Sequence, residues 1–285
     1  MNLKFEKYEG LGNDFIIIEE THIENINRSQ LAREMCHRKF GIGADGMIIC
    51  KLKPEIEMVF YNADGSRAPM CGNGIRCFGH YLKEKGHVKE NQVKIQTLAG
   101  QLNLEYKNEF ASESRVAMGQ GRFNSKEIPL SIETEKFVNE KLEIEGQEFE
   151  ISALYMGTTH SVIWKDNLDE EFVRRYGPKI ETHKLFPQKT NVNFVEYISS
   201  DEIKVITWER GAGLTLACGT GACAAVLIGN MLGRLNSQVK VHVLGGEMFI
   251  EILPTQVYMT GPSRKICSGE YNLNQIHGGN INENL

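Results

Sequence analysis

Two short stretches, MCGNGIRC at residues 70–77 and ACGTGACA at residues 217–224, share a pattern of cysteine, glycine, any residue and glycine. Each stands ahead of a helix-like stretch. A doubled motif of this kind indicates an internal repeat, and a repeat decides the fold because each copy builds the same structural unit. The same spacing recurs in the rest of the chain.

Other segments repeat at a nearly constant offset of about 146 residues. VKIQTLAGQLNLEY from residue 93 matches VKVHVLGGEMFIEI from residue 239, and both alternate like strands around a glycine-containing turn. GLGNDFIII from residue 10 likewise matches YMGTTHSVI from residue 155. We therefore predict two homologous halves, one of residues 1–118 together with 263–285 and the other of residues 119–262.

In each half the sequence predicts strands, a helix (28–39 or 169–183), further strands, the cysteine turn, a second helix and a hairpin, in this order. The second helix of the second half, from residue 221 to 233, is apolar and small around its whole circumference, whereas a surface helix keeps a polar face. We therefore expect a mixed α/β fold of two pseudo-symmetric domains. Each domain is a barrel-like sheet around a central helix, with the active site in the cleft between the domains.

The composition restricts the class of function. The 285 residues carry a net charge of −5 and no long block of Lys and Arg, so we expect no nucleic-acid or membrane partner. The start of the chain lacks the apolar core of a signal peptide, and no apolar run is long enough to span a bilayer. Seven cysteines, an odd number in a chain this large, favour reduced thiols. These features indicate a cytoplasmic protein that acts on a small molecule.

The doubled cysteine motif is suited to one kind of chemistry. Backbone N–H groups at a helix start lack partners within the helix, so they bind anions and lower the pKa of a neighbouring thiol. If the two starts face each other, a carboxylate held between them places a carbon atom between Cys71 and Cys218. One thiolate can then remove a proton while the opposite thiol delivers one to the other face. This chemistry requires no metal and no organic cofactor.

Other motifs have simpler explanations. GIGADG, from residue 41, matches the dinucleotide-binding pattern, but it follows a helix-like segment and precedes a strand, which is the reverse of the required order. The cysteines form no paired zinc-binding spacing with the histidines, so we expect no metal site. The remaining five cysteines read as small buried apolar residues.

The chain resembles the diaminopimelate epimerase family, whose members are cofactor-independent amino-acid epimerases with two catalytic cysteines. The resemblance covers nearly the whole chain and depends on GLGNDF, YNADGS, MCGNGIRC, NVNFVE, WERGAG and ACGTGACA, in the family's order and spacing. It implies epimerisation of L,L-2,6-diaminopimelate to the meso isomer, for lysine and peptidoglycan precursor synthesis. It also suggests a homodimer.

The resemblance also implies residue roles. Cys71 and Cys218 are the acid and base pair. Backbone amides hold the reacting carboxylate, at Gly72, Asn73, Gly219 and Thr220. Asn13 lies beside the reacting centre, and the far end of the substrate is bound by Asn62, Asn191, Glu209 and Arg210. The two thiols are tuned by His160 and Glu209.

Two positions depart from the family pattern. Thr158 lies in MGTTH where MGNPH is usual, and Leu214 lies in GAGLT where a glutamate is usual. An epimerase or racemase for another amino acid, such as proline, on the same fold is therefore an alternative. A thiol redox switch, in which Cys71 and Cys218 form a reversible disulfide, is an alternative from another class, although it leaves the glycines and Arg210 without a purpose.

Overall fold

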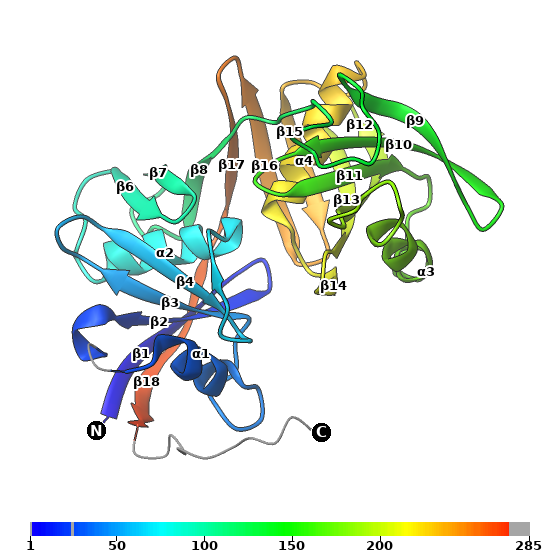
Figure 1. Cartoon of the computed structure of the whole chain (residues 1–285). Coiled ribbons are helices and arrows are strands. Elements are labelled where there is room, and N and C mark those ends of the chain that lie inside the picture. Colours follow the sequence, from blue (N-terminus) through cyan, green and yellow to red (C-terminus); the bar gives the residue numbers. More distant parts are fainter. Residues whose placement is uncertain (1, 24–25, 274–285) are drawn as a thin grey trace.

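The computed structural model describes residues 2–23 and 26–273, so residues 274–285 of the predicted first half lie outside the described part. Two halves, each of strands around a helix, lie side by side (Figure 1). The prediction of a mixed α/β fold is confirmed. Within the described residues, no helix is long and apolar enough to cross a membrane.

The first half extends along the chain from β1 to β8. Its elements are β1 (Asn2–Gly10), β2 (Asn13–Glu19), a 3-10 turn (Glu20–His22), α1 (Arg28–Cys36), β3 (Gly46–Lys51), β4 (Glu57–Asn62), β5 (Arg67–Ala68), α2 (Gly72–Glu84), β6 (Gln92–Thr97), β7 (Gly100–Tyr106) and β8 (Glu113–Gly119).

The elements of the second half, followed by the last strand, are β9 (Phe137–Ile144), β10 (Gln147–Tyr155), β11 (Thr159–Trp164), α3 (Glu170–Glu181), β12 (Asn191–Ser199), β13 (Glu202–Glu209), β14 (Gly213–Thr215), α4 (Gly219–Met231), β15 (Gln238–Val243), β16 (Gly246–Leu253), β17 (Gln256–Pro262) and β18 (Arg264–Asn272). From β10 to β17 the second half repeats the order of the first without the 3-10 turn, and β9 precedes it.

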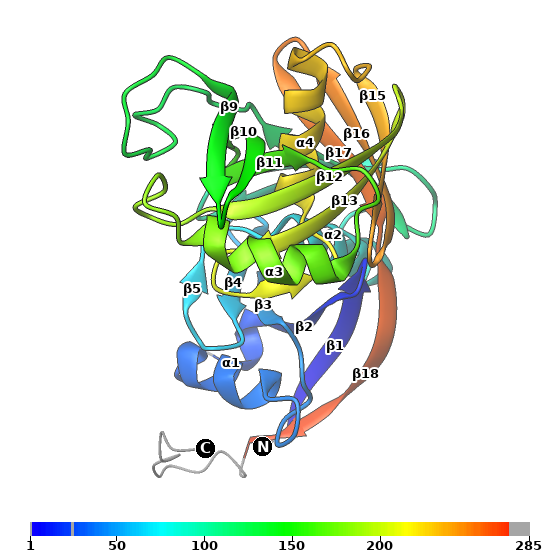
Figure 2. The same ribbon diagram turned by 90° about the vertical axis from the view of Figure 1, so that its right-hand side faces the viewer.

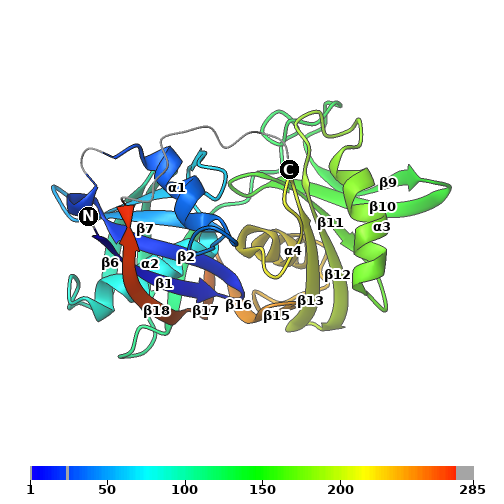
Figure 3. The same cartoon turned by 90° about the horizontal axis from the view of Figure 1, so that it is seen from below.

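The two halves share one continuous hydrogen-bonded sheet. β17 pairs antiparallel with β8, and the chain then passes directly into β18, which pairs antiparallel with β1. Figure 3 shows β17 and β18 running from one half into the other. The junction therefore contains backbone from both ends of the chain.

The outer helices begin at capping side chains. The side chain of Asn27 accepts a hydrogen bond from the Gln30 amide at the start of α1, and Asp169 does the same for the Phe172 amide at the start of α3. Both helices end before the predicted residues 39 and 183. Each cap satisfies one amide of the first turn, and the helices pack on strands of their own halves, α1 on β3 and β4 and α3 on β12 and β13.

The central helices are buried. α4 packs against strands of its own half, namely β10, β11, β12, β13, β16 and β17. The predicted buried central helix is thus confirmed, and its small residues let the strands approach closely. α2 occupies the equivalent place in the first half, as Figure 2 and Figure 3 show from two sides.

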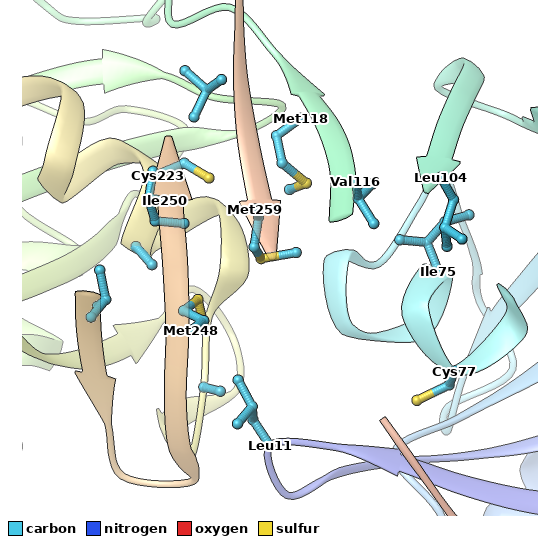
Figure 4. Close-up of a cluster of buried hydrophobic side chains, with 14 of the residues drawn as sticks. Leu11, Ile75, Cys77, Leu104, Val116, Met118, Cys223, Met248, Ile250 and Met259 are labelled. Carbon is cyan, nitrogen blue, oxygen red and sulfur yellow. The ribbon is translucent and has the colours of Figure 1, made fainter. Parts of the chain in front are cut away.

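One apolar core joins the halves. It contains residues of both α2 and α4 together with β8, β16 and β17. Figure 4 shows Met118 of β8 and Met259 of β17 together at the junction, with Ile75 of α2 on one side and Ile250 of β16 on the other. This shared core fixes the first turns of the two central helices relative to each other.

Candidate active site

One cleft of about 1160 Å³ contains nearly all the predicted site residues. Its lining includes Asn13, Asn62, Cys71, Gly72, Asn73, Asn191, Glu209, Arg210, Cys218, Gly219 and Thr220. The two unusual residues, Thr158 and Leu214, line it as well. His160 is not part of the lining, because it is fully buried behind the cleft.

The two cysteines occupy equivalent positions at the starts of the central helices. Cys71 is the N-cap of α2 and Cys218 the N-cap of α4, both have extended backbone, and neither side chain caps its helix. The first hydrogen bonds within the helices run from Ile75 N to Cys71 O and from Ala222 N to Cys218 O. The three amides before each of these have no carbonyl partner within the helix. The amides of Asn73, Gly74 and Gly221 are directed at the neighbouring cysteine sulfur, and those of Gly72, Gly219 and Thr220 are available to an anion.

The two helix starts lie against each other. A Cβ atom added to Gly72 would lie 3.9 Å from the Cα atom of Gly219, and one added to Gly219 would lie 2.8 Å from the Met259 sulfur. A side chain at Gly219 would therefore require the Met259 side chain to shift. The glycines permit a close approach of the two backbones beside the cysteines.

A chain of polar groups orients the residue that faces Cys71. The Asn13 amide nitrogen donates to the Asp45 carboxylate at 2.7 Å, and Arg38 in turn donates to Asp45 at 2.6 Å. The carbonyl oxygen of Asn13 therefore faces the other way and accepts from the Cys71 thiol at 3.5 Å. Asp45 belongs to GIGADG, which matches the dinucleotide-binding pattern but lies between a helix and a strand in the wrong order for it.

Burial raises the pKa of Cys71 to about 11. The backbone amides of Gly74 and Asn73, which donate to its sulfur, act in the opposite direction. The negative charge of Glu209 raises this pKa and the positive charge of Arg76 lowers it.

Cys218 lies beside a carboxylate. Its thiol donates to the Glu209 carboxylate and lies 3.5 Å from the Thr220 hydroxyl. Thr215 holds Glu209 in place by donating its hydroxyl at 2.6 Å. Burial raises the pKa of Cys218 well above its usual value, and the charge of Glu209 raises it further, although Thr220 and the Gly221 amide oppose this. Burial also raises the pKa of Glu209.

His160 and Asn193 form a polar pair behind α4, and both are completely buried. The Asn193 amide nitrogen lies 3.1 Å from His160 Nδ1, and its oxygen accepts from the Thr207 hydroxyl at 3.1 Å. Since an amide nitrogen only donates, Nδ1 accepts and Nε2 carries the hydrogen. Burial, and then the charge of Arg210, lowers the pKa of His160 to about 3, so the imidazole is neutral. Among the described residues, Nε2 has no hydrogen-bond partner.

The predicted far-end residues differ in how free their side chains are. Asn191 uses both ends of its amide, donating to Thr159 O at 3.1 Å and accepting from Arg210 N at 2.9 Å. Arg210 donates to Gln188 O at 3.1 Å, and its side chain is otherwise exposed to the cleft. Asn191 thus orients Arg210, while Asn62 donates to the Ser66 hydroxyl at 2.9 Å within its turn.

Two residues of the site were missed from the sequence. They are Asp45, which lies in the glycine-rich stretch GIGADG, and Asn193, which lies in NVNFVE. A signal existed for Asn193, because it lies two residues after Asn191 on the same strand and therefore shares its face. Within residues 2–23 and 26–273, no group of three or more His, Cys, Asp or Glu side chains is placed to hold a metal ion.

The model of the diaminopimelate epimerase family matches residues 5–124 and 152–266. The chain belongs to this family. It is 45% identical to the diaminopimelate epimerase of Alkaliphilus metalliredigens over 95% of this chain and 98% of the relative. It is 46% identical to that of Carboxydothermus hydrogenoformans over 94% of this chain and 99% of the relative. The chain is therefore an isomerase.

More distant solved structures share the fold. A hydroxyproline epimerase from Agrobacterium vitis superposes with a TM-score of 0.69 at 12% identity, covering 95% of this chain and 93% of the other. A Bacillus anthracis protein of the PhzF family superposes with a TM-score of 0.67 at 13% identity, covering 96% and 100%. The fold is thus used by epimerases and by other proteins, so the reaction must be argued from the residues of the cleft.

Proposed function

We propose that the protein converts L,L-2,6-diaminopimelate to meso-diaminopimelate by two-base proton transfer at the α-carbon, in the synthesis of lysine and peptidoglycan precursors. The observation that carries this proposal is the pair of uncapped helix starts, each with a cysteine at its N-cap, on one cleft. The two family members named above, whose curated names state this activity, support the choice of substrate.

The helix starts hold the reacting end of the substrate. Its α-carboxylate lies between the first-turn amides of α2 and α4, where Gly72, Gly219 and Thr220 offer N–H groups. These groups also stabilise the charge that moves onto the carboxylate oxygens as the proton leaves. The α-carbon then lies between the two sulfur atoms.

Proton transfer proceeds without a change in net charge. The thiolate of one cysteine takes the α-proton and becomes a thiol, while the S–H bond of the other cysteine breaks and its proton forms the new C–H bond on the opposite face. Cys71 lies beside the Asn13 amide oxygen and feels the positive charge of Arg76, whereas Cys218 faces the Glu209 carboxylate, so Cys71 ionises first. Glu209 keeps the proton on Cys218, ready to be delivered, and the neutral His160 with Asn193 supports the start of α4 from behind.

The far end of the substrate bears an amino group and a carboxylate of its own. The exposed guanidinium of Arg210 on the cleft is suited to that carboxylate because its planar fork matches two oxygen atoms. Asn62 and Glu209 also line the cleft and offer acceptors to an ammonium group.

A second candidate is an epimerase for another amino acid. It is favoured by Thr158 and Leu214, which line the cleft in place of the amide and carboxylate usual in the family. Leu214 also packs against the apolar core under α3 and pairs with Trp208, so a carboxylate there would meet an apolar surface.

The test is turnover by the purified, fully reduced protein with L,L-diaminopimelate, proline and other L-amino acids in parallel, with chiral separation of the products. The proposal expects meso-diaminopimelate and no turnover of the others. Absence of meso product with both thiols titrated as free would overturn the choice of substrate. Racemisation of another amino acid would select the second candidate.

A further inference from the structure

Arg76, on α2, is the largest of the fully buried side chains among the described residues. It belongs to MCGNGIRC but lies behind the helix start, not in the lining of the cleft. Among the described residues it makes no ion pair with a carboxylate. A buried guanidinium without a carboxylate is costly to the free energy of folding, so its charge calls for an explanation.

The guanidinium is held by four other groups. Its Nε donates to Pro262 O at 3.1 Å, and Nη1 donates to Gly72 O at 3.3 Å and to the Met259 sulfur at 3.4 Å. Nη2 donates to Asn73 Oδ1 at 3.0 Å. Pro262 and Met259 belong to β17, so Arg76 connects α2 to the strand that joins the two halves.

The fold leaves room for this side chain by omitting two others. A Cβ atom on Gly10 would lie 3.3 Å from Nη2, and one on Gly261 would lie 3.1 Å from Nε. Both glycines lie in strands that meet at the junction, β1 and β17. The space for the guanidinium is thus formed by backbone from both ends of the chain.

Arg76 also orients Asn73. Because Asn73 Oδ1 accepts from the guanidinium, its amide nitrogen faces the other half, where it donates to Ala217 O at 3.1 Å. Asn73 is itself buried, and Ala217 immediately precedes Cys218. A continuous chain of hydrogen bonds therefore runs from Arg76, five residues past Cys71 on α2, to the residue before Cys218.

The first half has a positively charged residue at this position of the repeat, and the second half does not. In the alignment of the two cysteine motifs, Cys223 of α4 occupies the position of Arg76. The titratable groups that face Arg76 are Cys71 and Cys77 on its own helix, Cys223 on α4 and Glu9 on β1. Cys71 is faced in addition by Glu209 of β13.

We propose that Arg76 is a positioning residue that clamps the two helix starts together through Asn73 and makes Cys71, rather than Cys218, the thiol that loses its proton more readily. This proposal rests on the two-base function proposed above and adds an assignment of the two thiols. Arg76 does not touch the substrate, and it acts through Asn73 and through its charge.

The principal test compares Arg76→Met with the parent, since methionine is of similar length but uncharged. Alkylation of each cysteine by iodoacetamide is followed against pH by peptide mass spectrometry on the full chain without substrate, and kcat and KM are measured separately. We expect the alkylation midpoint of Cys71 to rise by about one pH unit while that of Cys218 shifts less. We expect kcat to fall by about a hundredfold, with a smaller change in KM.

Arg76→Lys separates the charge from the clamp, because lysine keeps the charge but lacks the fork that reaches both Asn73 and Pro262. In this variant we expect the pH midpoint of Cys71 alkylation to equal that of the unmodified protein. We expect kcat to be about tenfold lower. Cys77→Ala, on the same helix, is the control and should keep the parent values. If Arg76→Met does not fold, Arg76→Lys decides, and a parent kcat in that variant overturns the clamp.

A folded Arg76→Met with the parent midpoint at Cys71 would overturn the assignment of the charge. The alkylation profile needs no substrate, so it also separates the two proposals. A shift at Cys71 without epimerisation by the parent enzyme would refute the proposed function and leave the role of Arg76 supported.

Discussion

The starts of α2 and α4 have the same backbone and different surroundings. Both place an uncapped cysteine on the cleft, but two equivalent strand positions behind them differ. In the first half these positions hold Phe15 and Ile48, which pack against Gly74. In the second half the strand registers place His160 and Asn193 there, and Asn193 packs against Gly221.

The neighbours of the two thiols differ in charge as well. Cys71 faces an amide oxygen and feels the buried cation Arg76, whereas Cys218 donates to the Glu209 carboxylate. The duplication therefore supplies two equivalent anion-binding helix starts, and the few positions that broke the symmetry make one thiol easier to ionise than the other. Two thiols in identical surroundings would ionise equally readily.

The largest effect is expected from removing either thiol. Cys71→Ser and Cys218→Ser should each reduce epimerisation by about a thousandfold or more, because a serine hydroxyl is a far weaker acid than a thiol and is not ionised near neutral pH. Formation of meso-diaminopimelate measures the loss, and thermal unfolding shows that the fold remains. The matched controls are Cys77→Ser and Cys223→Ser, one on each helix. Turnover near that of the parent in either cleft variant would rule out the two-base model.

A smaller loss is expected from Glu209→Gln. This change removes the negative charge that keeps the proton on Cys218, so the pKa of Cys218 should fall and its alkylation near pH 7 should become faster by about tenfold or more. Epimerisation should fall by about a hundredfold, with Glu202→Gln at the surface as the control. An unchanged alkylation rate of Cys218 would show that Glu209 does not set its charge.

The polar pair behind α4 makes the two helices respond differently to an added methyl group. A Cβ atom on Gly221 would lie 2.1 Å from Asn193 Oδ1, whereas one on Gly74 would come no closer than 3.3 Å to any neighbour. Gly221→Ala should lower the free energy of unfolding by about 2 kcal/mol, and Gly74→Ala by less than about 1 kcal/mol. Chemical denaturation measures both. Adding Asn193→Ala to Gly221→Ala should recover part of the loss, and equal effects at the two glycines would refute the asymmetry.

The smallest effect concerns the unmodified protein. Burial raises both thiol pKa values, to about 11 for Cys71 and well above the usual value for Cys218, so both are mostly protonated near neutral pH. Because only thiolates are alkylated, the rate at each cysteine should rise by about tenfold per pH unit below its pKa. Cys71 should react faster than Cys218 at every pH in this range. Faster alkylation of Cys218 would reverse the assignment.

The repeat made much of this structure predictable. Cys71 and Cys218 recur with the same flanking glycines, and the small residues after Cys218 predict a buried helix because no polar face remains for solvent. Those two features predict the paired cysteines on one cleft, and the family resemblance supplies nine further predicted residues that line it. The parallel between the halves therefore carried more information than any single motif.

The remaining residues depend on contacts that sequence spacing does not specify. Asp45 reaches Asn13 only because β2 pairs in parallel with β3, and Asn193 meets His160 only through the pairing of β11 with β12. Arg76 lies at a junction formed by both ends of the chain. Its burial contradicts the usual preference of arginine for the surface, so composition and periodicity could not have indicated it.

The central claim is that two thiols act on opposite faces of one carbon. The most direct measurement follows the α-hydrogen in deuterated water at early times, with L,L-diaminopimelate and the reduced enzyme, by mass spectrometry of the separated isomers. The account predicts deuterium in the meso product while the unreacted L,L isomer keeps its original hydrogen. Deuterium appearing equally early in both isomers, or a product that retains the original hydrogen, would contradict it.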